Sequence, residues 1–178
     1  MSKKQARYGP IDRYGPPPGA GMCISVFIVI RPAGRKQVLL GLMKPSQEWQ
    51  DEWLSGLSVY PENEKKLVFD QWRLPSCYLR EGENPRGAVD RVLKDQVNLQ
   101  SFGVSDTPRV FSYSSKSDWY PGNEHWDLVF AYDVKTGSNK PPENPKWWRE
   151  MRYYDSRKEI ESMDFGWNSD FMHDLNLL

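Results

Sequence analysis

The stretch from Leu74 to Leu99 constrains the fold more than any other part of this 178-residue chain. It opens with an apolar residue and a proline, and it then passes through a charged Gly turn at residues 80–83. Asn84 and Pro85 predict a helix start, because Asn accepts from the first free N–H groups and Pro needs no donor at the first helical position. Apolar residues then recur at three- and four-residue spacing, as on one buried helix face: Ala88, Val89, Val92, Leu93 and Val97.

Asn98 favours the left-handed backbone conformation that commonly ends a helix. The segment is therefore predicted to be a loop, a helix and a stop. This layout resembles the Nudix box, the family signature G-x5-E-x7-R-E-U-x-E-E-x-G-U, in which U is a bulky aliphatic residue. Glu83 stands at the first Glu of the signature and Arg91 at its Arg, while Leu93 and Leu99 stand at its two aliphatic positions.

The departures from the signature fall on its chemistry. Cys77 replaces the first Gly, Val92 the first helical Glu and Asn98 the last Gly, while Asp95 and Gln96 replace the Glu-Glu pair. In the family, the three helical carboxylates bind the Mg²⁺ or Mn²⁺ ions that activate water against a diphosphate. Positions i, i+3 and i+4 bring these carboxylates to one helix face. The loss of two of them predicts a fall in hydrolysis of at least ~10²–10⁴-fold, roughly 3–6 kcal/mol.

The resemblance makes Glu83, Arg91 and Glu124 the catalytic candidates, with Arg91 holding the turn. It leaves Glu83 and Asp95 as metal ligands. Many Nudix proteins draw an extra metal ligand or base from the region of residues 118–126, where His125 is a candidate base or phosphate contact, although a lone His is more often structural. Replacement carboxylates would come from five residues: Glu81, Asp90, Asp118, Glu124 and Asp127.

The composition excludes several classes of protein. The 24 basic residues balance 24 acidic ones, so no global field recruits nucleic acid or membrane. Cys23 and Cys77 provide neither a disulfide framework nor a zinc spacing, which favours a reducing, cytoplasmic compartment. No apolar run approaches the roughly 20 residues that span a bilayer, and no apolar signal core begins the chain, so we expect no membrane partner.

Residues 1–21 are predicted to be a flexible tail that precedes one domain at residues 22–178. The tail contains no Val or Leu and one Ile, so it lacks the residues for a core. The sequence Arg-Tyr-Gly-Pro occurs at residues 7–10 and again at 13–16. These Arg and Tyr side chains suit stacking on RNA bases or docking on a protein partner. A loosely packed tail is the simpler interpretation.

Two of the eight Trp residues, Trp49 and Trp53, lie in a segment at 44–73 that is longer than the family usually places before its box. An indole face stacks on any base, so Trp49 and Trp53 join His125 as the ligand-binding candidates. The simpler interpretation is that the two Trp residues pack the segment onto the sheet.

The rest of the domain predicts strands in an order typical of Nudix folds. Residues 22–31 and 37–43 are rich in Ile, Val and Leu, and a turn at Pro32-Ala33-Gly34 predicts that they form a hairpin. The other predicted elements are a strand at 68–74, an antiparallel pair at 109–114 and 127–134, a last strand at 147–154, and helices at 155–163 and 168–178.

This order of elements implies an α/β fold, a Nudix-type α/β/α sandwich with a mixed β-sheet. Three functions stay open: a catalytically impaired Nudix-fold protein that recognises a nucleoside-diphosphate-linked ligand, an active Mg²⁺- or Mn²⁺-dependent pyrophosphohydrolase with a reduced ligand set, and a non-catalytic interaction subunit. The residue types at Val92 and Gln96 favour the first. Exposure of Val92 beside an open, acid-lined cleft would favour the second.

Overall fold

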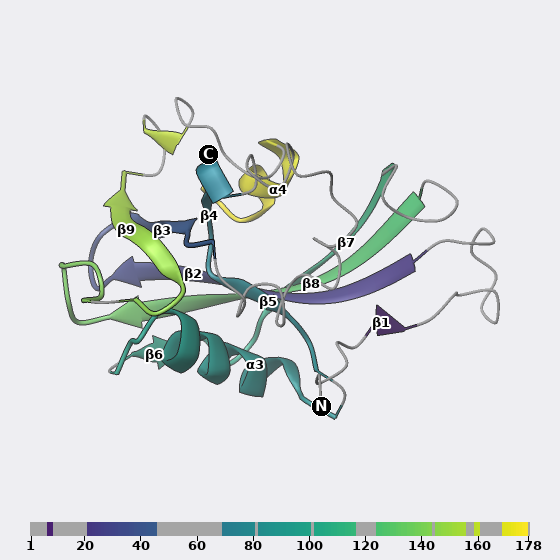
Figure 1. Cartoon of the computed structure of the whole chain (residues 1–178), viewed down its shortest axis with the longest axis horizontal. Coiled ribbons are helices and arrows are strands. Elements are labelled where there is room, and N and C mark those ends of the chain that lie inside the picture. The colour runs from purple at the N-terminus through teal and green to yellow at the C-terminus, as the bar shows by residue number, and fades with distance from the viewer. Residues whose placement is uncertain are drawn as a thin grey trace.

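The structure is a computed structural model that describes residues 7–8, 21–45, 69–80, 82–100, 102–116, 124–143, 145–155, 159–160 and 169–177. In these ranges two β-sheets form the middle of the molecule, and helices lie on either side of them (Figure 1).

The larger sheet is built on two long parallel strands. Strand β2 (Gly21–Pro32) pairs with β8 (Glu124–Thr136) along its whole length, from Gly21 opposite His125 to Pro32 opposite Thr136. Antiparallel strands join them, which makes the sheet mixed. These are β1 (Arg7–Tyr8) and β5 (Ser76–Tyr78) on β2, and β6 (Gly103–Val104) and β7 (Arg109–Lys116) on β8.

The smaller sheet is antiparallel, with β3 (Val38–Met43) between β4 (Trp72–Arg73) and β9 (Trp148–Tyr154). The predicted hairpin between the first two strands is therefore wrong, although Gly34 does form the turn with φ +74°. The edges of β2 are taken by β8 on one side and by β1 and β5 on the other, so β3 finds its partners elsewhere.

The side chains of β2 alternate between two hydrophobic cores. Val26, Ile28 and Ile30 pack with the box helix, α3 (Pro85–Arg91), and with its extension η3 (Val92–Gln96). Phe27 and Val29 point the other way, toward helix α4 (Ser169–Asp174). A strand that is buried on both faces has apolar residues at nearly every position, which explains the unbroken apolar run from Val26 to Ile30.

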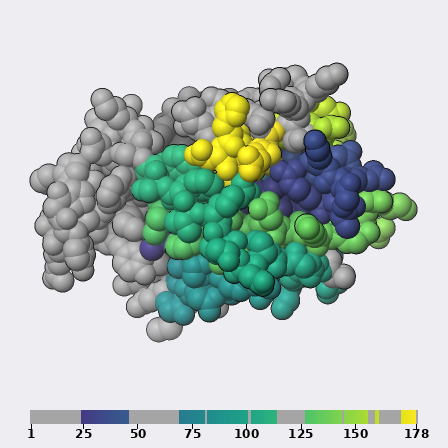
Figure 2. Space-filling model, turned by 180° about the vertical axis from the view of Figure 1, so that it is seen from behind, coloured from purple at the N-terminus to yellow at the C-terminus, as the bar shows by residue number. Residues whose placement is uncertain are grey.

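The layers follow from this alternation. Helix α3 covers one face of the sheet and α4 lies on the opposite side (Figure 1), and the view from behind shows the same order, with yellow α4 above and teal α3 below (Figure 2). The predicted α/β/α sandwich with a mixed sheet is confirmed.

The predicted elements differ from the observed ones mainly in length. The antiparallel pair is confirmed and is longer than predicted, whereas the strand predicted at 68–74 is observed only as the two residues of β4. The final helix α4 is shorter than residues 168–178, and most of the helix predicted at 155–163 lies outside the described residues. No helix in the described ranges is long and apolar enough to cross a bilayer.

Candidate functional site

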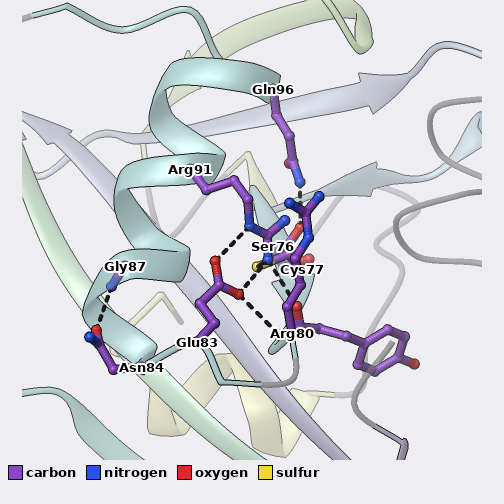
Figure 3. Close-up of polar contacts among 9 residues, drawn as sticks. Ser76, Cys77, Arg80, Glu83, Asn84, Gly87, Arg91 and Gln96 are labelled. Carbon is purple, nitrogen blue, oxygen red and sulfur yellow. Dashed lines mark hydrogen bonds and ion pairs between the residues drawn. The ribbon is translucent and has the colours of Figure 1, made fainter. Parts of the chain in front are cut away.

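The box segment is held at both ends by local hydrogen bonds. At its start, the Asn84 side chain accepts from the backbone N–H of Gly87 at 2.7 Å, with Pro85 beginning the helix (Figure 3). At its end, Asn98 has φ +59°, and the N–H of Leu99 donates to the carbonyl of Leu93 at 2.8 Å. The predicted loop, helix and stop are therefore confirmed.

Glu83 and Arg91 form a two-pronged ion pair that fixes the loop to the helix. Arg91 Nε donates to Glu83 Oε1 at 2.8 Å, and its Nη2 donates to Oε2 at 2.9 Å (Figure 3). The same carboxylate accepts from the backbone N–H of Arg80 at 3.0 Å, and Arg91 Nη2 also donates to the carbonyl of Tyr78 at 3.1 Å. The Glu83 carboxylate thus serves three donors from the loop and the helix.

This ion pair is largely shielded from water, with 11% of the Arg91 side chain and 17% of the Glu83 side chain exposed. Burial lowers the pKa of Arg91 to about 10, against the opposing effect of Asp95. The guanidinium therefore still carries its charge at neutral pH.

Cys77, at the signature's first Gly, is buried beside this ion pair. Arg91 Nη2 lies 3.4 Å from its sulfur. Burial, and then the charge of Glu83, raise the pKa of the Cys77 thiol, and Arg80 acts in the opposite direction. The thiol is therefore protonated at neutral pH, and it packs in the same core as the box helix.

The helix face that carries the family's carboxylates points into the protein. Val92 is 0% exposed and Gln96 is 1% exposed, whereas Asp95 lies on the surface. Gln96 Nε2 donates to the carbonyl of Ser76 on β5 at 3.0 Å (Figure 3). Its Oε1 is buried and finds no hydrogen-bond partner in the part of the chain that the structure describes. These three side chains do not converge on one open point.

No family model matches this sequence, and no curated protein matches it either. Solved structures do match. The E. coli dihydroneopterin triphosphate pyrophosphohydrolase is 14% identical with a TM-score of 0.53, over 75% of this chain and 80% of that chain. The NUDIX domain of Shewanella oneidensis NrtR, complexed with ADP ribose, is 10% identical with a TM-score of 0.54, over 87% of this chain and 86% of that chain.

A third match is a bifunctional NMN adenylyltransferase/ADP ribose pyrophosphatase from Francisella tularensis, which is 14% identical with a TM-score of 0.55 over 88% of this chain and 40% of that chain. This chain has the Nudix fold. At these identities the similarity concerns the fold, and the chemistry of this Nudix-fold protein depends on its own residues.

The described residues around the box helix do not fit the divalent metal that the Nudix fold implies. A hard cation needs several oxygen ligands around one point. Val92 offers no donor atom, Gln96 is buried against β5, and Glu83 is held by Arg91, which leaves Asp95 by itself on this helix face. The described ranges contain no group of three or more His, Cys, Asp or Glu that could hold a metal ion.

Other predicted residues lie away from this helix face or outside the described ranges. Asp90 pairs with exposed Arg86 at 2.9 Å, and Asp127 is half-buried on β8. Glu124 and His125 begin β8, opposite Lys116 and Ser115 of β7, but their side chains are outside the described part. Four further candidates lie wholly outside it, so their roles stay predictions: Trp49, Trp53, Glu81 and Asp118.

Sequence reasoning missed Ser76 and Arg80. Ser76 contributes a backbone carbonyl to Gln96, which no residue type signals. For Arg80, the pattern of apolar and polar residues in the sequence did give a signal. Cys77 and Leu79 are apolar and alternate with polar neighbours, a pattern that turns Arg80 away from the core beneath the helix.

Proposed function

We propose that this chain recognises a nucleoside-diphosphate-linked ligand and does not hydrolyse it through the box helix. The observation that carries the proposal is the burial of Val92 and Gln96 at two of the three carboxylate positions of the signature.

A metal at this face would require a rearranged core. Val92 packs with Leu93, Ala88 and Val89 against β2, so opening this face would expose apolar surface. Exposing a Val side chain costs about 1.5–3 kcal/mol. Gln96 would in addition have to give up its hydrogen bond to Ser76. Both costs oppose a metal-binding conformation of the box helix.

The choice of first ligand follows from the similar structures. The NrtR domain was solved with ADP ribose, and the Francisella protein is described as an ADP ribose pyrophosphatase. ADP ribose contains the diphosphate linkage that the resemblance implies, and so it is the ligand with which to begin.

The runner-up function is an Mg²⁺- or Mn²⁺-dependent pyrophosphohydrolase that takes carboxylates from outside the box helix. Its candidate ligands outside the helix are Glu81, Asp118, Glu124 and Asp127, and Asp90 is a further candidate on the helix itself. The interaction subunit, which would bind RNA or a protein through residues 1–21, also stays a prediction. Among the tail residues that the structure describes, Arg7 and Tyr8 pair with Cys23 and Met22 of β2, and Gly21 begins β2 itself.

The test combines binding with turnover. Calorimetric titration with ADP ribose in EDTA measures binding, and release of nucleoside monophosphate or phosphate with Mg²⁺ and then Mn²⁺ measures hydrolysis of ADP ribose, dinucleotides and nucleoside triphosphates. We expect binding without turnover. Metal-dependent turnover that is lost in Asp95→Asn and retained in Asp106→Asn, an exposed acid outside the box helix, would instead establish a hydrolase. Absence of binding by the folded protein would sink the ligand assignment.

A further inference from the structure

We infer that Arg80 binds the diphosphate group of the ligand and supplies the positive charge that a divalent metal would otherwise supply. This inference rests on the proposed function, because it concerns the same ligand and the same side of the box helix.

The backbone of Arg80 is fixed before any ligand arrives. Its N–H donates to Glu83 Oε2 at 3.0 Å, and that carboxylate is itself held by Arg91. One residue earlier, the N–H of Leu79 donates to the carbonyl of Ile24 on β2 at 2.9 Å. A binding residue whose backbone is already ordered loses less entropy when it binds. The Glu83–Arg91 pair therefore positions Arg80.

The side chain of Arg80 leads toward the position where the family places a metal ligand. Cys77 and Leu79 lie in the core beneath the helix, whereas Arg80 is half-buried. Figure 3 shows its side chain running back past Ser76 toward the helix end that carries Gln96. A cationic group thus extends toward a helix end where a metal ligand has been replaced by an amide.

The charge of Arg80 acts on this same region. It lowers the pKa of the buried Cys77 thiol, although burial and Glu83 together outweigh it. The neighbouring Glu83 carboxylate is matched by both prongs of Arg91. Binding a diphosphate through Arg80 would therefore leave the ion pair that orders the loop intact.

Guanidinium chemistry suits binding without hydrolysis. The planar fork of Arg donates two parallel hydrogen bonds to phosphate oxygens and stays protonated at neutral pH. A metal ion would in addition lower the pKa of a bound water and so generate a nucleophile, which a guanidinium does not do. Replacement of the metal by Arg80 would keep recognition of the diphosphate and lose the attacking hydroxide.

The experiment is titration of ADP ribose and ADP, in EDTA, into the parent protein and three variants. Arg80→Ala should weaken binding of both ligands by roughly 10- to 100-fold, the usual value of a hydrogen bond to a charged group. Arg80→Lys keeps the charge and loses the fork, so its affinity should lie between those of the parent and Arg80→Ala. Arg86→Ala removes an exposed Arg that is paired with Asp90, and it should bind like the parent.

The outcomes separate this inference from the proposed function. Equal affinities of the parent and Arg80→Ala would overturn the role of Arg80 and leave the proposed function standing. Binding that requires added Mg²⁺ would have the same two consequences. A folded parent that binds neither ligand, in EDTA or with added Mg²⁺, would overturn both. If Arg80→Ala unfolds, a loss of affinity in folded Arg80→Lys supports the role and unchanged affinity overturns it.

Discussion

Val92 shows how one residue can change the chemistry that a helix face allows. At the first helical Glu position of the signature, this side chain is 0% exposed and belongs to the core between the box helix and β2. A carboxylate there has to face solvent or a metal, whereas the apolar isopropyl group of Val is stabilised by burial. The residue that removes a metal ligand therefore also helps to close the face.

Val92→Glu should lower the free energy of unfolding by about 3–5 kcal/mol at pH 7, because it buries a charge without a partner. Burial raises the pKa of the new carboxyl above its unfolded value of about 4.3. The loss should thus be smallest below about pH 4.3 and grow as the pH rises. Urea denaturation between pH 4 and 7 measures it.

The matched control for this substitution is Val110→Glu, because Val110 is 53% exposed on β7. We expect Val110→Glu to change the free energy of unfolding by less than about 1 kcal/mol. Equal stability of the two variants would contradict the closed face.

At the scale of elements, β3 and β9 are joined by a close contact that glycine permits. A Cβ added at Gly41 on β3 would overlap the Trp148 ring on β9, since it would touch Cε3 and lie 2.8 Å from Cδ2. Trp148 is 3% exposed, so its ring has little room to move away. The two strands pair near this point, with a register irregularity between Leu42 and Met43. The smaller sheet therefore depends on the absence of a side chain at residue 41.

Gly41→Ala should lower the free energy of unfolding by about 1–3 kcal/mol, the usual cost of overpacking. Gly103→Ala in β6 is its control, because an added Cβ there meets nothing within 4 Å. Ala in a strand should be neutral or better than Gly by up to about 1 kcal/mol. Urea denaturation of the two variants and the parent measures these differences in the free energy of unfolding. A Gly41→Ala protein as stable as Gly103→Ala would show that the Trp148 ring yields.

Helix α4 is an element that tertiary contacts hold in place. The Tyr113 hydroxyl donates to Asp174 Oδ2 at 2.5 Å, and Arg109 Nη1 donates to the carbonyl of Asp174 at 3.1 Å. Arg31 Nη2 donates to the carbonyl of Asn176 at 3.3 Å. Carbonyls at the end of a helix have no partners within the helix, and Arg side chains satisfy them. A helix of six residues is marginal by itself, so these contacts and its buried apolar side stabilise it.

At the scale of the whole molecule, burial on both faces of the sheet changes the response to alkaline pH. Burial raises the pKa of the Cys77 thiol and the pKa of the hydroxyls of Tyr132, Tyr153 and Tyr154, to about 12 for Tyr153. Groups whose folded pKa is raised stabilise the protein below their unfolded pKa, and this contribution is lost as the pH rises. The first loss should begin near pH 9, the ordinary pKa of a Cys thiol, before the tyrosines titrate.

Cys77→Ala should remove this first loss. Between pH 8 and 10 the free energy of unfolding of the parent should fall more steeply than that of the variant, with a difference approaching about 1.4 kcal/mol per pH unit for one proton. The lowered pKa of Arg91, to about 10, acts in the opposite sense at higher pH, which is why the window ends there. Urea denaturation at several pH values measures both slopes. Parallel curves for parent and variant would contradict a protonated, buried Cys77.

What the sequence predicted well was local. Asn84, Pro85 and Asn98 mark the ends of the box helix through hydrogen bonds and backbone conformations within a few residues. The apolar residues at 22–31 predicted a core strand, and the order of elements, through its resemblance to Nudix folds, predicted the layers. The sequence also placed Glu83 and Arg91 at interacting positions, since the resemblance ties the loop to the helix.

By itself, then, the sequence determined where the helix around the box begins and ends, which strands are buried, and that two of three helical carboxylates are missing. Only the tertiary structure decided that β2 pairs with β8 rather than with β3, that Val92 and Gln96 face inward, and that Arg80 leads toward Gln96. The physical reason is range. Caps and turns depend on neighbouring residues, whereas strand partners and the direction a side chain faces depend on packing between segments far apart in the chain.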